Sequence, residues 1–238
     1  MPNRVVPTAQ AAIAGIQSGM TIMVGGFGIA GVPFDLLEAI RLQGLRDLTV
    51  ISNNAGFGGR DLTSWIEAGM VRKVICSYPR TSPACIAQWK AGQLEIEVVP
   101  QGTLTERMRC AGAGLGGVFS PVSAGTLLAE GKEQRTMNGI DYVLELPLRA
   151  DVALLHAHRA DPYGNLTYRM TARNFSPIMA TAAKLVVVEV AEMVEALNPE
   201  HVITPGIFID RLLPLPSFLP PLPLGEGRGE GPTQSTTP

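Results

Sequence analysis

Four glycines gather in one short stretch of the chain, at a spacing that binds phosphate in some proteins. The stretch consists of Gly25, Gly26, Phe27, Gly28, Ile29, Ala30 and Gly31. Its G-x-G-x-x-G pattern falls on Gly26, Gly28 and Gly31, between a predicted strand and a predicted helix. In a dinucleotide site, such a turn and the following helix N-terminus hold pyrophosphate. The turn therefore indicates backbone contact with a phosphate or pantetheine group, unless it only allows a tight strand-to-helix crossing.

A nicotinamide dinucleotide also requires an acidic side chain at the end of the second strand, where it binds the ribose. Ser52, Asn53 and Asn54 occupy that place, and Asp47 lies before the strand. Because the acid is missing there, an NAD-dependent dehydrogenase is an alternative that only the glycine spacing supports. A nicotinamide-binding titration would test it.

Gln101 and a histidine pair could also take part in chemistry. Gln101 follows a predicted strand, and its amide could donate to a developing oxyanion, although loop glutamines are more often solvated turn residues. His156 and His158 share one face of a predicted strand and could reach one metal ion. No third Cys or His lies nearby in sequence, and His201 is distant, so we expect half-buried histidines and no metal site.

The chain offers no obvious nucleophile. It contains no G-x-S-x-G, the motif of one class of serine hydrolases. Cys76, Cys85 and Cys110 form no C-x-x-C pair, so neither a disulfide framework nor a zinc ribbon fits. All three fall within predicted strands or helices, where buried thiols are inert.

Alternating strands and helices must position these residues. Short apolar runs predict strands at 21–24, 48–52, 71–77, 94–99, 152–158, 166–168 and 185–190. Helical patterns lie between most of them, which indicates βαβ units on a largely parallel sheet. Open sheets of this kind bind ligands at the carboxyl ends of their strands, where both Gly25–Gly31 and Gln101 fall.

Capping signals set the expected helix bounds. Helices are expected from Pro33 to about Gln43, from Asp61 to near Gly69, from Ser82 to Gly92, from just after Gly102, and at 177–184. Thr103 and Glu106 have the T-x-x-E spacing of a capping box for the fourth of these helices. Asn138-Gly139 predicts a type I′ hairpin turn.

Composition excludes several classes of protein. With 19 Lys and Arg against 21 Asp and Glu, the chain has no electrostatic footprint for nucleic acid. No run approaches the ~18 apolar residues of a membrane helix, and no signal peptide is evident, so we expect a cytoplasmic protein and no membrane partner. Residues 214–238 hold seven Pro and four Gly, which predicts a disordered tail after a single domain at 1–213.

Taken together, these motifs resemble the alpha subunit of the two-subunit 3-oxoacid CoA-transferases. The resemblance rests on Thr21–Pro33, Val98–Arg107, the A-G-A-G-L-G-G stretch, Ala157–Tyr168, Ala172–Phe175 and Ile203–Phe208. These blocks keep the family's order and cover the chain from about Val6 to Leu213. The segments I-S-N-N-A-G, S-Y-P-R and I-T-P-G-I-F are most similar to the 3-oxoadipate branch. Acetate and acetoacetate enzymes share the framework and remain alternatives.

The resemblance implies an α/β fold, a three-layer α/β/α sandwich around a mostly parallel sheet, as in sugar-phosphate isomerases. It implies CoA transfer between succinyl-CoA and a 3-oxo acid by a ping-pong reaction through a glutamyl-CoA thioester. In this family the nucleophilic Glu lies in an S-E-N-G motif of the beta subunit, whereas this chain has no S-E-N-G. The chain would then be half of an enzyme that the beta subunit completes, with CoA as a substrate and no tightly bound cofactor.

The same resemblance implies roles for particular residues. Gln101 would donate to the thioester oxygen, and Gly25–Gly31 would shape the CoA-facing site. Gly112 and Gly114 would line the same cleft. His156 stands where relatives often carry a basic residue, which puts a local ion pair in doubt. A non-catalytic ligand-binding protein on the same fold is the alternative outside the enzymes.

Overall fold

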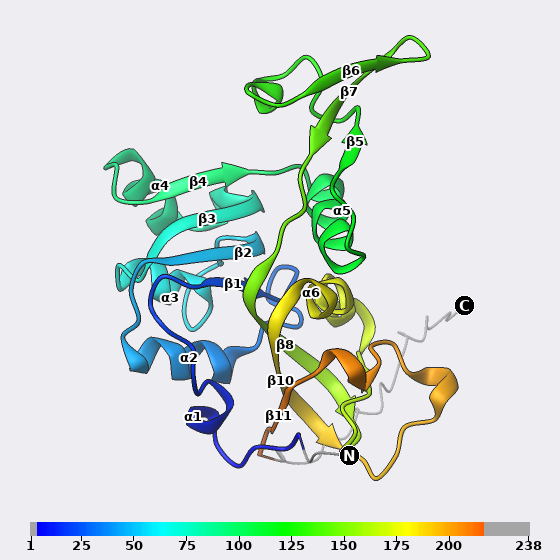
Figure 1. Cartoon of the computed structure of the whole chain (residues 1–238). Coiled ribbons are helices and arrows are strands. Elements are labelled where there is room, and N and C mark those ends of the chain that lie inside the picture. The colour runs from blue at the N-terminus through cyan, green and yellow to red at the C-terminus, as the bar shows by residue number, and fades with distance from the viewer. Residues whose placement is uncertain (1–3, 217–238) are drawn as a thin grey trace, which may run out of the picture.

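The computed structural model describes residues 4–216, which form a sandwich with a smaller sheet projecting from one end (Figure 1). Within these residues the central sheet has eight strands, and its main path runs β11-β10-β8-β1-β2-β3-β4. The strands are β1 (Thr21–Val24), β2 (Leu48–Asn54), β3 (Val71–Tyr78), β4 (Glu95–Val98), β8 (Ala150–Ala160), β9 (Leu166–Thr167), β10 (Ala183–Met193) and β11 (Arg211–Pro214). Every neighbouring pair along this path is parallel, and only the short β9 pairs antiparallel with β8. The expected mostly parallel sheet is therefore confirmed.

Helices cover both faces of this sheet. They are α1 (Ala9–Ala12), α2 (Phe34–Gln43), α3 (Leu62–Glu67), α4 (Pro83–Lys90), α5 (Gln101–Gly112) and α6 (Ser176–Ala182). Successive strand residues point to opposite faces, so Ile22 and Val24 of β1 join the core under α1–α4, whereas Met23 joins the core under α5 and α6. The three-layer α/β/α sandwich is confirmed. No helix in residues 4–216 is long and apolar enough to cross a membrane.

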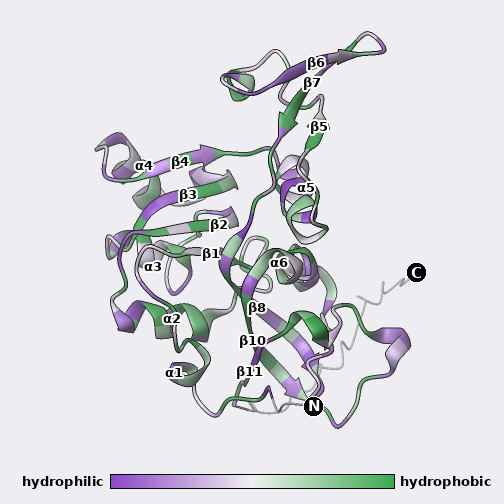
Figure 2. Ribbon diagram, in the orientation of Figure 1, coloured by the Kyte–Doolittle hydropathy of each residue, from purple (hydrophilic) through white to green (hydrophobic). Residues whose placement is uncertain are grey.

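A small antiparallel sheet stands apart from the sandwich. It comprises β5 (Val118–Ser120), β6 (Gln134–Met137) and β7 (Ile140–Glu145), in the order β5-β7-β6. Asn138 and Gly139 have φ of 53° and 77°, as the predicted type I′ turn requires. Figure 2 shows that β6 is largely hydrophilic, whereas β5 is hydrophobic. Short 3₁₀ helices lie at Pro79–Thr81, Leu127–Ala129, Met170–Arg173, Pro199–His201 and Gly206–Phe208.

Three local predictions are corrected by the structure. β2 extends to Asn54, so Asn53 and Asn54 are buried strand residues and not part of a polar loop. α5 already begins at Gln101, with Pro100 as its N-cap, so the expected capping box at Thr103 is wrong. Pro214 lies in the unpredicted strand β11, one residue inside the expected tail, and residues 217–238 lie outside the described residues.

Candidate active site

The stretch Gly25–Gly31 folds into a tight hairpin directly after β1. Phe27 N donates to Ala30 O at 3.0 Å, and Ala30 N donates to Phe27 O at 3.2 Å. Gly28 and Ile29 form the two-residue turn, and Gly28 has the positive φ, 62°, that a type II′ turn requires at this position. The hairpin leaves Phe27 and Ile29 46% and 66% exposed. Its tip is therefore an apolar projection at the carboxyl edge of the sheet.

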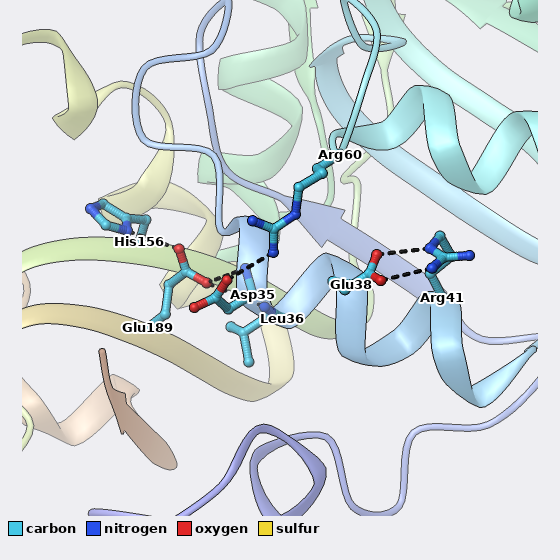
Figure 3. A network of polar contacts seen from close by, with 7 residues as sticks. All are labelled: Asp35, Leu36, Glu38, Arg41, Arg60, His156 and Glu189. Atoms are coloured by element: carbon cyan, nitrogen blue, oxygen red, sulfur yellow. Dashed lines mark hydrogen bonds and ion pairs between the residues drawn. The ribbon is translucent and has the colours of Figure 1, made fainter. Parts of the chain in front are cut away.

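The helix that follows this hairpin has its N-terminal amides occupied. Glu189 lies on β10, is 2% exposed, and accepts hydrogen bonds through Oε2 from Asp35 N at 3.0 Å and Leu36 N at 3.2 Å. Its Oε1 lies 3.0 Å from His156 Nδ1 (Figure 3). A pyrophosphate at the start of α2 would need the N–H groups that this carboxylate already binds. The geometry therefore does not support a dinucleotide site at the glycine motif.

The histidine pair is now accounted for by protein contacts. His156 binds Glu189, so a local interaction survives at the position where relatives often carry a basic residue. Burial, with a contribution from the nearby charge of Arg159, lowers the pKa of His158. Within residues 4–216, no group of three or more His, Cys, Asp or Glu is arranged to hold a metal ion.

Gln101 lies at the same edge of the sheet as the hairpin. Asn53, at the carboxyl end of β2, donates through Nδ2 to Gln101 Oε1 at 3.4 Å. The Asn53 Oδ1 accepts from Asn54 Nδ2 at 3.4 Å, and Asn54 Oδ1 accepts from Gly56 N at 2.7 Å. Because Asn53 binds the oxygen of the exposed Gln101 amide, the NH₂ group of that amide is left to donate elsewhere. This is the polarity that a developing oxyanion needs.

Asn53 contributes to this site although the sequence patterns did not point to it. The available signal was the run Ser52–Asn54, in which polar side chains interrupt an otherwise apolar strand at its carboxyl end. That run counted only as evidence against an acidic residue. The structure shows that Asn53 is 5% exposed and reaches across the end of the sheet to the first residue of α5.

An open pocket of about 420 Å³ adjoins Gln101. It lies between the first turns of α5 and the strand β5, and its lining includes Gly102, Glu106, Phe119 and Val122. Within the described residues, no side chain caps the N-terminus of α5. The pocket thus combines an apolar wall with an uncapped helix end, and its volume is suitable for a small acyl group.

The structure separates Gly112 and Gly114 from Gln101. Gly112 ends the helix that Gln101 begins, about 16 Å away at a rise of about 1.5 Å per residue. A Cβ on Gly112 would lie 2.1 Å from Thr181 Oγ1 of α6, so close packing of the two helices accounts for this glycine. Gly114 has φ of 71°, as befits the turn after the helix.

The thiols do not supply a nucleophile. Burial raises the pKa of Cys76 to about 12 and that of Cys85 to about 11, so both stay protonated near neutral pH. Cys110 is also buried, in the core under α5 and α6. The expectation that these cysteines are buried is confirmed.

Comparison with known proteins identifies the family. Residues 6–214 match the family model described as Coenzyme A transferase. The chain is 54% identical over 217 residues to the alpha subunit of the 3-oxoadipate CoA-transferase of Pseudomonas putida, covering 90% of this chain and 94% of that one. It is 47% identical over 208 residues to the alpha subunit of the acetate CoA-transferase of Escherichia coli K12, covering 87% and 94%.

A solved structure shares the fold. The acyl-CoA transferase of Escherichia coli O157:H7, solved as a thioester complex with CoA, matches with a TM-score of 0.78 at 23% identity. The match covers 88% of this chain and 46% of that longer chain, so this chain spans about half of it. Because the family model spans residues 6–214 and close relatives match over most of their length, the chain belongs to the coenzyme A transferase family.

Proposed function

We propose that this chain is the alpha subunit of a heteromeric CoA-transferase that moves CoA between succinyl-CoA and a 3-oxo acid, with 3-oxoadipate as the favoured acceptor. The 54% identity to the Pseudomonas putida protein supports this substrate class. The observation that carries the proposal is the contact between Asn53 and Gln101, which leaves an amide donor free at the carboxyl edge. Such a donor stabilises the oxyanion that forms when a thioester is attacked.

The proposed reaction needs a nucleophile from the beta subunit. There, a glutamate carboxylate attacks the thioester carbonyl and expels the CoA thiolate, which gives an acyl-glutamyl anhydride. The thiolate then attacks the glutamyl carbonyl and releases the acid, and the acceptor acid reverses both steps. Covalent catalysis of this kind replaces one difficult exchange by easier steps. Gln101 would stabilise the charge on the carbonyl oxygen, while Asn53 holds the Gln101 amide in its donating orientation.

We propose that the hairpin Gly25–Gly31 faces CoA. It lies at the same edge of the sheet as Asn53, on the strand next to β2. Because Glu189 occupies the first amides of α2, this contact would be made by the hairpin itself and not by the helix dipole. The exposed Phe27 and Ile29 side chains suit the apolar parts of the pantetheine arm. Gly112 and Gly114 would contribute only to the folding of the loop after α5.

The test is succinyl-CoA consumption with 3-oxoadipate, acetoacetate and acetate, measured for this chain alone and for the chain co-expressed with its beta subunit. We expect activity only in the pair, with the highest kcat/KM for 3-oxoadipate. Activity of the chain alone would contradict the need for the second polypeptide. Preference for acetate would favour the alternative that the 47% identity to the Escherichia coli acetate enzyme supports.

A further inference from the structure

Asn174 has an unusual backbone conformation next to the candidate site. Its φ of 28° and ψ of −124° lie outside the regions that residues with a Cβ normally occupy. It follows the 3₁₀ helix Met170–Arg173 and precedes α6. Such a conformation persists only where surrounding contacts enforce it, and it is often found at functional sites.

The side-chain amide of Asn174 bridges the two arms of the hairpin Gly25–Gly31. Its Oδ1 accepts from Gly26 N at 3.1 Å, on the arm that leaves β1. Its Nδ2 donates to Ala30 O at 3.1 Å, on the returning arm. One amide therefore binds both arms, although it lies 148 and 144 residues away in the chain.

Neighbours of Asn174 hold the same hairpin by packing. The Phe175 ring lies against the Phe27 ring with a centroid separation of 6.5 Å and an interplanar angle of 29°. A Cβ on Gly31 would lie 2.5 Å from Ala172 O, so only glycine allows this close approach. The segment 172–176 thus contacts the hairpin from its first arm to its last glycine.

We propose that Asn174 is a positioning residue that fixes the hairpin in the conformation that receives CoA. The proposal rests on the proposed function, in which the hairpin faces CoA. A two-stranded hairpin is marginally stable by itself, and this one has two cross-strand hydrogen bonds of its own. Only a side-chain amide of this length offers both an acceptor for Gly26 N and a donor for Ala30 O. This requirement explains why Asn, and not glycine, occupies a strained position.

Asn174→Gly separates the two roles of this residue, because glycine adopts the backbone conformation freely but lacks the amide. In the assembled pair, we expect kcat/KM for succinyl-CoA to fall about 10²-fold, as misplaced binding groups cause. kcat/KM for the 3-oxo acid should fall less, because CoA is already tethered to the enzyme in that half-reaction. Loss of folded enzyme would lower both values equally. Amide hydrogen exchange at residues 26–30 should become faster.

The matched control is Asn138→Gly, which makes the same substitution at a positive φ in the β6–β7 turn, away from the hairpin. It should leave both kinetic constants and exchange at residues 26–30 unchanged. If the glycine variant of Asn174 does not assemble, Asn174→Asp keeps the acceptor for Gly26 N, loses the donor for Ala30 O, and should give the same unequal loss at smaller size.

Wild-type kinetics or unchanged exchange in Asn174→Gly would overturn the proposal, and so would faster exchange with equal losses in both half-reactions. If the wild-type pair transfers no CoA from succinyl-CoA to any acid tested, the proposed function fails separately. Exchange at residues 26–30 then still decides whether Asn174 holds the hairpin.

Discussion

The helices α2 and α5 both begin near the carboxyl edge of the sheet, yet their N-termini are treated in opposite ways. At α2, the buried carboxylate of Glu189 accepts from two main-chain amides and is itself held by His156. At α5, Pro100 is the N-cap and no side chain in the described part of the chain caps the helix. Gln101, the first residue of α5, has its amide oxygen bound by Asn53.

This difference separates structure from chemistry at one edge of the sheet. A helix N-terminus attracts negative charge, so a carboxylate that is permanently bound there stabilises the fold and excludes a ligand. The glycine motif precedes α2, where the protein supplies its own anion. The uncapped helix with a free amide donor is α5, which follows a less conspicuous proline and glutamine. Substitutions at the two helices test this assignment.

The largest effect is expected at α5. Gln101→Ala removes the proposed donor and should lower kcat of the pair about 10²–10³-fold, as loss of an oxyanion donor does elsewhere. Steady-state assays with succinyl-CoA measure it, and size-exclusion chromatography should show unchanged assembly with the beta subunit. Gln93→Ala is the matched control, because Gln93 is an exposed glutamine beyond the opposite end of β4. A Gln101→Ala pair with wild-type kcat would disprove the donor role.

At α2, the expected effect is on folding. Glu189→Ala leaves two N–H groups at a buried helix end without their acceptor and should lower the free energy of unfolding by about 3 kcal/mol. Urea denaturation of the purified chain measures this change. Glu192→Ala, on the same strand, removes an exposed carboxylate paired with Arg159 and should cost less than about 1 kcal/mol. Equal losses in the two variants would mean that the buried cap contributes nothing special.

The two ends of α5 should also behave differently. Gly112→Ala places a Cβ against Thr181 and should destabilise the chain by about 2 kcal/mol through overpacking. KM for succinyl-CoA in the assembled pair should stay unchanged, because Gly112 lies a helix length from Gln101. Gly116→Ala, in the loop after α5, is the stability control. A raised KM with unchanged stability would restore Gly112 to the CoA site.

Local patterns were sufficient to predict most of the fold. β1 and the end of α2 match their predictions, because apolar runs and a glycine stop act on their immediate neighbours. β11 escaped prediction because it is a short edge strand ending in proline, a residue that is usually confined to sheet edges. The glycine motif was located correctly, but its hairpin form was not foreseen.

The contacts that organise the candidate site are not local. Asn53 reaches Gln101 over 48 residues, Glu189 reaches Asp35 over 154, and Asn174 reaches Gly26 over 148. Each is a hydrogen bond from a side chain that has no periodic pattern around it. Gln101 and the glycine stretch could therefore be named from the sequence, but the residues that hold them in place could not.

The failed capping box at Thr103 gives the smallest and most discriminating prediction. Because α5 begins two residues earlier than expected, Thr103 lies inside its first turn, with an Oγ1 that is buried and has no hydrogen-bond partner within residues 4–216. Thr103→Val keeps the shape and removes the desolvated hydroxyl, so it should raise the free energy of unfolding by up to about 1 kcal/mol. A capping threonine would give a loss of about 1 kcal/mol instead. Asp61, whose side chain does cap α3, provides the comparison, and Asp61→Ala should show that loss. The sign of the Thr103 effect in urea denaturation therefore decides whether the start of α5 is uncapped, as the contrast with α2 requires.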